Sequence, residues 1–408
     1  MEEIRIVLLG FGSANRALVE MLCSKSELLG RQRSLRINRS GKSQLIPWRV
    51  VSIVTGRHGA VCIPTETDLI YEVNLQKALK VYESGRMLDD SLIVDQDGAC
   101  ILSKSDYRES AHHATGVQTI ELLRTLAASN SANVVIEAIP SNPRNGEGEP
   151  AVSFIRAALL AGLHVVSANK GPLAQQLSKH EEVYWNLQHI AAQSNVQYLH
   201  ESAVMDGVPI FSLWQRTLPN ASVTKIRGCL NSTTTMILTE MEGPNGHTFD
   251  EALHKAKEMG IVEKDESLDI DGYDAAVKLR ALLVVFSNSS EGCQILVPSI
   301  DDIHRDSIRN ITREDIQRAY NDDRKKYRLV ATAELMNVPE SNTQEWKASI
   351  QLEQIVRTDP IYNLSGTSSS VQFHTDVLGP ITMTSTDPTL VDTAYGLFSD
   401  IIRVVSSC

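Results

Sequence analysis

Residues 4–22 read IRIVLLGFGSANRALVEML, and this stretch decides the fold of the N-terminal half. The apolar run 4–9 predicts a buried β-strand, the glycines predict a tight turn, and residues 13–29 carry apolar side chains at helical spacing. In this order of strand, turn and helix, backbone N–H groups at the helix start can bind a pyrophosphate, which the helix dipole also favours. We therefore assign Gly10, Phe11 and Gly12 to cofactor binding.

Two further positions bear on the cofactor. Asn15 stands where a dinucleotide fingerprint has its third glycine, which predicts either a slightly shifted helix or a polar group near the phosphates, and we include it in the cofactor set. The predicted second strand, 48–54, ends at Thr55-Gly56-Arg57-His58, where such folds bind the adenine ribose. No acid is present to bind the 2′-hydroxyl of NAD, whereas Arg57 suits a 2′-phosphate. We predict NADP(H) in preference to NAD(H); an ordinary basic turn is the alternative.

Strands and helices continue to alternate along the chain. Residues 117–127 and 151–161 predict helices, 134–138 predicts a buried strand, and 162–171 predicts a strand that ends in a polar turn. This alternation is typical of a doubly wound parallel sheet. Ligands of such sheets bind at the carboxyl ends of the strands. We therefore add the residues that follow these strands to the cofactor set: Pro140, Ser141, Asn169 and Lys170. Lys170 is also suitably placed for catalysis, with a merely solvated lysine as the alternative.

The second informative stretch, 256–278, reads AKEMGIVEKDESLDIDGYDAAVK. Asp274 and Lys278 are four residues apart in a predicted helix, so their side chains share one face, while Glu263 and Asp269 lie in the polar loop before it. A lysine ammonium beside a carboxylate can exchange a proton with an oxygen, as the interconversion of a carbonyl and an alcohol requires. The alternative is a surface ion pair, which contributes only about 0.3 to 0.5 kcal/mol.

This stretch resembles the signature of the homoserine dehydrogenase family. The matching positions are Ala256, Gly260, Glu263, Asp265, Asp269, Gly272, Asp274 and Lys278, with Glu266 where the family usually has proline. The resemblance implies that Glu263 binds the substrate ammonium, that Asp274 and Asp269 help to place the substrate, and that Lys278 donates the proton to the carbonyl oxygen. The strand ending in Ala-Asn-Lys170 is also similar to the family, which implies that this lysine faces the reacting ends of cofactor and substrate.

Two other segments resemble the family less closely. The loop after strand 196–201 is similar to one whose backbone carbonyls hold a monovalent cation, with Na+ as the candidate; the matching residues are Glu201, Val204, Asp206 and Val208. The family loop is richer in glycine, and a hinge between domains is the alternative. Segment 226–238 matches a strand and helix where the family has Asn-Gly-Thr. Ser232 replaces the glycine, and Thr233 is kept. The resemblance gives Thr233 a substrate-binding role, with capping of the helix as the alternative.

The C-terminal segment departs most from the family. Residues 365–375 and 378–383 predict paired strands, and 389–404 predict a closing helix with Pro388 in its first turn. The family turn before this helix contains three glycines, and none is present at 385–389. We expect that contact with the cofactor to be lost or remade by side chains. We expect no regulatory ACT module of the kind that some family members carry beyond this helix.

Length and composition agree with a soluble enzyme. The 408 residues suffice for two cores, 42% are hydrophobic and 22% charged, and no apolar run approaches a membrane span. The net charge of -11 argues against nucleic-acid binding, which needs a basic face. The six cysteines form no Cys-x-x-Cys pair, so reduced thiols and a cytoplasmic location are expected.

These observations predict an α/β protein with a doubly wound Rossmann-type NAD(P)-binding domain and an α+β domain for substrate binding, catalysis and dimerisation. We expect the first to comprise residues 1–200 and 385–408, and the second 201–384. The resemblance implies an oxidoreductase that interconverts L-homoserine and L-aspartate 4-semialdehyde in threonine and methionine biosynthesis, and a homodimer. Two alternatives stay open: a related oxidoreductase acting on another small amino or hydroxy acid or aldehyde, and an NAD(P)-binding sensor without turnover.

Overall fold

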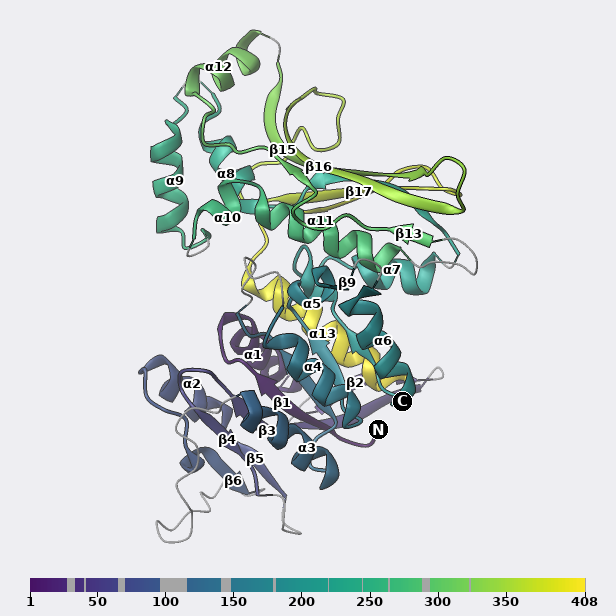
Figure 1. Cartoon of the computed structure of the whole chain (residues 1–408). Helices are drawn as coiled ribbons and strands as arrows, with labels where there is room; N and C mark the ends of the chain where they lie inside the picture. Colours follow the sequence, from purple (N-terminus) through teal and green to yellow (C-terminus); the bar gives the residue numbers. More distant parts are fainter. Residues whose placement is uncertain are drawn as a thin grey trace. The chain divides into compact units, whose positions relative to one another are not determined.

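The computed structural model describes residues 1–27, 34–39, 42–64, 70–95, 116–140, 148–178, 181–218, 220–243, 245–262, 265–287, 294–322 and 324–407. The chain divides into two compact units (Figure 1). Unit 1 comprises residues 1–172, 185–207 and 390–408, and unit 2 comprises residues 173–184 and 208–389. The predicted assignment of nucleotide binding to 1–200 with 385–408, and of substrate binding and dimerisation to 201–384, stays a prediction.

Unit 1 is built on a largely parallel sheet with strand order β11-β8-β7-β1-β3-β2. Its elements are β1 (Ile4–Leu9), α1 (Ser13–Glu27), β2 (Ser34–Arg39), β3 (Lys42–Val54), β4 (Ala60–Cys62), β5 (Tyr71–Val73), α2 (Leu75–Glu83), η1 (Asp90–Leu92), β6 (Ile93–Asp95), α3 (Gly116–Ala128), β7 (Val134–Glu137), α4 (Ala151–Leu160), β8 (His164–Ser167), β11 (Tyr198–Leu199), η3 (Glu201–Ala203) and α13 (Leu390–Ser407). The chain passes from unit 1 to unit 2 within helix α5 (Gly171–Ala174) and returns to unit 1 within helix α6 (Val183–Gln193).

The strand order of unit 1 determines where a ligand can bind. β1 pairs in parallel with β3 on one side and with β7 on the other, so the order of strands reverses between β1 and β7. Helices α1 and α13 pack together, and α3 packs with α4, which contacts β7 and β8. A doubly wound sheet binds ligands at the carboxyl ends of its strands at this reversal. The predicted Rossmann-type architecture is confirmed, and the turn after β1 lies at the expected place.

Two predicted strands differ from those observed. Strand 48–54 is the second half of a longer strand, β3, whose first half forms an antiparallel hairpin with β2. Strand 196–201 is limited to β11, because Glu201 already begins the short helix η3. Within 162–171, β8 ends at Ser167, and the predicted turn follows it. The closing helix α13 begins at Leu390, so Pro388 precedes it and is not part of its first turn.

Unit 2 is an α+β unit with strand order β13-β16-β15-β12-β17-β18. Its elements are β9 (Gln176–Ser178), β10 (Glu181–Glu182), α7 (Ile210–Thr217), β12 (Val223–Cys229), α8 (Ser232–Glu240), α9 (Phe249–Glu258), α10 (Ser267–Ile270), α11 (Tyr273–Phe286), β13 (Gln294–Leu296), β14 (His304–Arg305), α12 (Arg313–Asp322), β15 (Lys326–Asn337), β16 (Thr343–Ile355), β17 (Ser369–Thr375) and β18 (Ile381–Ser385). The predicted pairing of the last two strands is antiparallel, as β17 and β18 show.

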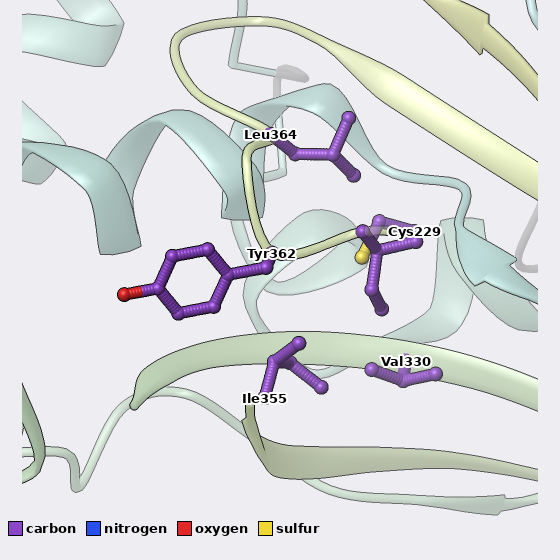
Figure 2. Packing of buried hydrophobic residues seen from close by; sticks show 6 residues of the cluster. Cys229, Val330, Ile355, Tyr362 and Leu364 are labelled. Atoms are coloured by element: carbon purple, nitrogen blue, oxygen red, sulfur yellow. The ribbon is translucent and has the colours of Figure 1, made fainter. Parts of the chain in front are cut away.

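A hydrophobic cluster fixes the end of β12, which leads into the second half of the candidate site. Figure 2 shows Cys229 of β12 beside Val330 of β15 and Ile355 of β16, with Tyr362 and Leu364 from the following loop. Each of these side chains is at most 8% exposed. Burial at this level typically contributes about 1.5 to 3 kcal/mol for a large apolar side chain. The backbone that leaves β12 towards α8 is therefore held by core packing.

Candidate active site

The glycine turn of unit 1 has the geometry that a phosphate-binding turn requires. Gly10 has a φ of +86°, and a Cβ at this position would lie 2.6 Å from the carbonyl oxygen of Ala138. Its N–H donates to the oxygen of Val54 at 2.8 Å. At Gly12, in contrast, an added Cβ would have no described atom within 4 Å, so the start of the 15-residue helix α1 faces open space. The turn fits a dinucleotide, whose pyrophosphate would be bound by backbone N–H groups there.

Asn15 binds the glycine turn from inside. Its side chain is fully buried, and its Nδ2 donates to the carbonyl oxygens of Gly10 at 2.7 Å and of Leu9 at 3.3 Å. The side-chain amide therefore connects α1 to the turn by hydrogen bonds. A glycine at this position would connect them only by allowing close packing. This accounts for the missing third glycine of the fingerprint.

A cluster of aromatic and basic side chains lies beside the end of β3. Arg57 is exposed, and the neighbouring His58 ring lies 4.5 Å from the ring of Tyr82 on α2. Tyr82 also meets Phe11 of the glycine turn edge to face at 5.5 Å, and the Arg16 guanidinium lies over its ring at 5.3 Å. The sequence did not single out Tyr82, because α2 lies in a segment for which no role was predicted, and it did not single out Arg16, which lies on α1.

The carboxyl ends of β7 and β8 carry a buried polar network. Glu137 accepts hydrogen bonds from Ser167 Oγ at 2.5 Å, from the Ile139 N–H at 2.9 Å and from Asn169 Nδ2 at 3.5 Å. Burial raises the pKa of the Glu137 carboxyl, while these hydrogen bonds lower it. Lys170 follows directly and is half-buried. Of the predicted residues after β7, Pro140 is exposed, and Ser141 lies outside the described residues.

In unit 2 the amide of Asn231 connects two of the predicted carboxylates. Its Nδ2 donates to Asp269 Oδ1 at 2.7 Å and to Asp274 Oδ2 at 2.9 Å. Its Oδ1 accepts the Thr234 N–H at 2.8 Å and so caps α8. Asp269 is 3% exposed and Asp274 6%, so these are buried, charge-assisted hydrogen bonds. Sequence reasoning missed Asn231, although the family-like Asn-Ser-Thr segment contains it.

Lys278 completes this group. Its Nζ lies 2.8 Å from Asp274 Oδ2 and donates to the Leu230 carbonyl oxygen at 3.0 Å. The side chains are 19% and 7% exposed, respectively, so the alternative of an ordinary surface ion pair is wrong. The described structure therefore brings together three of the predicted residues, Asp269, Asp274 and Lys278. A partly shielded ammonium between a carboxylate and a carbonyl is equipped for proton transfer.

Gly272 gives α11 its starting direction. It precedes Tyr273 with a φ of +71°, in the left-handed region that favours glycine. A Cβ at this position would lie 3.2 Å from both the Asp306 carbonyl oxygen and Ile350 Cγ2. The turn into α11 thus depends on a residue without a side chain. It sets the position of Asp274 and, one helical turn later, of Lys278.

Thr233 faces the loop that precedes the acidic residues. It is 4% exposed, and its hydroxyl donates to the Ile261 carbonyl oxygen at 3.0 Å. The alternative that Thr233 caps α8 is wrong, because Asn231 fills that role. Glu263 lies outside the described residues.

Comparisons with known proteins identify the family. The model of the family described as homoserine dehydrogenase matches residues 209–402. A homoserine dehydrogenase of Sulfurisphaera tokodaii is 30% identical over 68% of this chain and 78% of its own length. The chain belongs to the homoserine dehydrogenase family. The predicted resemblance is confirmed, and with it the class of enzyme, an NAD(P)-dependent oxidoreductase acting on a CH–OH group.

Two further relatives extend over the whole chain. An NAD(+)-dependent homoserine dehydrogenase of Pseudomonas canavaninivorans is 27% identical over 100% of this chain and 97% of its own. A hyperthermophilic archaeal homoserine dehydrogenase, solved in complex with NADPH, has a TM-score of 0.66 at 24% identity, covering 100% of this chain and 98% of its own. At this identity the structural likeness establishes the fold alone.

The loop that resembles the family's cation-binding loop contains two left-handed residues. Met205 and Asp206 both have a φ of +59°, in the left-handed region that favours glycine. The Asp206 carboxylate accepts a hydrogen bond from Thr393 Oγ1 on α13 at 2.8 Å. Glu201 is buried, and its carboxylate pairs with Arg403 at 3.2 Å. Val204 is fully buried. Val208 belongs to unit 2, where its carbonyl oxygen accepts the Ile210 N–H.

The glycine-free turn before α13 is built by an aspartate. Asp387 adopts a φ of +44°, and aspartate is one of the few residues besides glycine that tolerate this region. Its Oδ1 accepts the Thr367 N–H at 3.2 Å, and its own N–H donates to Ser368 Oγ at 3.2 Å. The turn thus retains a left-handed residue although the family's three glycines are missing.

No helix among the described residues has both the length and the hydropathy for a membrane span. Nor do three His, Cys, Asp or Glu side chains gather at a metal-binding distance in that part of the chain.

Proposed function

We propose that this family member interconverts L-homoserine and L-aspartate 4-semialdehyde with NADP(H). The observation that carries the proposal is the shielded Lys278–Asp274 pair at 2.8 Å, which the Asn231 amide links to Asp269. A bound nicotinamide cofactor supplies the hydride for the aldehyde carbon. Lys278 gives its proton to the oxygen of that carbonyl group, and Lys170 polarises the carbonyl. Asp274 orients Lys278, while Glu263, Asp269 and Thr233 hold the amino-acid part of the substrate.

The environment of Lys278 supports its role as proton donor. Asp274 and the Leu230 carbonyl both favour the ammonium form, so the lysine enters the reduction charged. On reduction the new hydroxyl takes one proton, and Lys278 becomes a neutral amine. In the opposite direction the amine removes the homoserine hydroxyl proton. Asn231 Nδ2 donates to both carboxylates, and these hydrogen bonds favour their charged forms and hold them in place during this cycle.

Oxidation of NADPH by the purified chain with aspartate 4-semialdehyde is the primary test, and Lys278→Met is the decisive variant. We expect turnover to fall by about 100-fold or more, because general acid catalysis typically contributes about 10² to 10⁴. NADPH affinity should change little. Lys255→Met is the matched control, since Lys255 also pairs with a carboxylate in unit 2, Glu240 at 2.7 Å, but on the surface.

Normal turnover in Lys278→Met would refute the proposed donor. If the chain turned over only other small aldehydes, the alternative of a related oxidoreductase would be favoured. If it bound NADPH but turned over no substrate, the alternative of a sensor would be favoured.

The preference for NADP(H) rests on the basic end of β3. Arg57 is exposed there, and no acidic residue occurs at 55–58 to bind a ribose 2′-hydroxyl. The ratio of kcat/KM for NADPH and NADH measures the preference directly. Arg57→Ala should lower it by about 10- to 100-fold, because losing one charge-assisted hydrogen bond costs about 1.5 to 3 kcal/mol. Arg124→Ala removes an exposed arginine of the same unit and is the control. An unchanged ratio in Arg57→Ala would contradict the assignment.

We also infer a monovalent cation, Na+, at the backbone carbonyls of Glu201, Val204, Asp206 and Val208. The left-handed Met205 and Asp206 support it, because they give this loop the backbone form that glycine provides in the family. Activity in NaCl compared with choline chloride at equal ionic strength tests the requirement, and equal rates would refute it.

The proposed homodimer is tested by sedimentation equilibrium, where a monomer at assay concentration would contradict it.

A further inference from the structure

Glu137 is a buried acid for which the proposed reaction has no direct use. It is the last residue of β7, it is fully buried, and three groups donate hydrogen bonds to its carboxyl oxygens. Burying a charge is costly unless the charge is hydrogen-bonded, so a carboxylate kept at this position must be fully satisfied. Its partners come from β8 and from the two segments that follow β7 and β8.

The network continues from Glu137 to both sides of Lys170. Ser167 Oγ donates to Glu137 and accepts the Asn169 N–H at 3.0 Å. The Asn169 side chain donates to Glu137 through Nδ2, while its Oδ1 accepts the Gly171 N–H at 2.9 Å. Asn169, which precedes Lys170, therefore hydrogen-bonds to Glu137, and Gly171, which follows Lys170, is linked to Glu137 through the Asn169 side chain.

Both carboxyl oxygens of Glu137 take part in these hydrogen bonds. The Ile139 N–H and the Asn169 amide NH₂, which can only donate, both meet Oε1, while Ser167 Oγ meets Oε2 and also accepts the Asn169 N–H. An apolar side chain at this position would leave all three partners without their acceptor.

We propose that Glu137 is a positioning residue, which acts through Ser167 and Asn169 to fix the 168–171 turn and thereby the direction of Lys170. The inference rests on the proposed function, in which Lys170 polarises the substrate carbonyl. Glu137 also binds the Ile139 N–H, in the segment that the glycine turn approaches most closely, since a Cβ on Gly10 would lie 3.2 Å from Ile139 Cγ2. One buried carboxylate thus sets the shape of two segments proposed to contact the cofactor.

The first test compares Ser167→Ala with Ser167→Thr and with a matched control. Ser167→Ala removes the link, and we expect kcat to fall by about 10- to 100-fold, because a misplacement of about 1 Å can cost about 10² in rate. The KM for the aldehyde and the NADPH Kd should change less than kcat, and Ser167→Thr should restore most of the loss. Ser52→Ala removes another fully buried serine of the same sheet, whose hydroxyl donates to the Val61 carbonyl oxygen at 2.9 Å. Its turnover should be unchanged even if its Tm falls.

A double-mutant cycle separates positioning from general stabilisation. If Ser167 acts through Lys170, the double variant Ser167→Ala/Lys170→Met loses no more activity than Lys170→Met alone, whereas independent effects multiply. If the two activity losses multiply in the double variant, the positioning role is wrong and the proposed function stays intact. The same holds if Ser167→Ala has normal turnover while Lys170→Met is impaired. Normal turnover in Lys170→Met would instead refute the proposed role of Lys170.

Hydrogen exchange of the chain without cofactor supplies a readout that needs no activity. Glu137→Met removes both carboxyl oxygens and should accelerate exchange of the Gly171 amide, because the Asn169 side chain that protects it loses its anchor. The Leu163 amide, which donates to the Ala158 carbonyl oxygen away from the network, should keep its protection and so report on an intact fold. Unchanged Gly171 exchange in Glu137→Met would refute the inference even if the proposed reaction fails.

Discussion

The turn at Gly272 allows a quantitative prediction that separates backbone strain from steric crowding. Gly272→Ala places an alanine at a φ of +71° and adds a Cβ 3.2 Å from the Asp306 oxygen and from Ile350. The left-handed conformation costs about 1 to 2 kcal/mol for a non-glycine residue. Forcing a methyl group into a packed site adds about 1 to 3 kcal/mol. We therefore expect a loss of about 2 to 5 kcal/mol in the free energy of unfolding.

Gly243→Ala is the matched control for this prediction. Gly243 lies in the same unit with a φ of +81°, but an added Cβ would meet no described atom within 4 Å. It should lose only the conformational part, about 1 to 2 kcal/mol. Urea unfolding followed by circular dichroism measures both variants. Turnover should fall in Gly272→Ala, because Asp274 and Lys278 follow the turn, and should stay normal in Gly243→Ala. Equal losses of stability in the two variants would refute the steric argument.

Three further outcomes are expected. Asn231→Leu should cost more stability in urea unfolding than Asn74→Ala, although both residues cap a helix, because only Asn231 also bridges two buried carboxylates; equal costs would contradict this. Burial raises the pKa of the Cys229 thiol to about 12, so iodoacetamide at pH about 8 should label the half-buried Cys23 before Cys229 in the native chain, as mass spectrometry would detect. Burial also raises the pKa of Glu137, so the folded chain binds this proton more readily than the unfolded chain. Its contribution to stability falls as the pH rises from about 4.5 through the folded pKa. The stability of Glu137→Gln relative to wild type should therefore increase as the pH rises above about 4.5 in thermal unfolding; the opposite sign would contradict the burial argument.

Local sequence patterns predicted the parallel sheet well. The first strand is observed at the predicted residues, Ile4–Leu9, and helix α4 differs from its prediction by one residue at its end. Both are continuous apolar or amphipathic runs bounded by turn residues. The long hairpin of β15 and β16 was not predicted, because β16 is largely polar and β15 mixes polar and apolar residues without strict alternation. Their stability comes from pairing along twelve residues, which a local pattern does not reveal.

From residue spacing alone, the candidate site was predictable only within one helix, whereas Asp269 in the neighbouring helix α10 was identified through the resemblance to the family. Asp274 and Lys278 are one helical turn apart, so their spacing alone indicated the pair. Asn231 is 38 and 43 residues away from the carboxylates that it binds, and its local signal is that of an ordinary helix cap. Arg16 and Tyr82 likewise meet only through folding. Contacts between distant segments depend on topology, which the spacing of residues does not encode.

The return of the chain to unit 1 through α13 has a consequence for the order of folding. Helix α13 packs against α1, with Ala394, Leu397 and Ile401 fully buried. The ribosome completes residues 208–389 of unit 2 before it synthesises this helix, so unit 2 can fold while the apolar face of α1 still lacks its partner. Until α13 emerges, that face is a surface on which nascent chains can aggregate or chaperones can bind. Removal of residues 390–408 would make this transient exposure permanent.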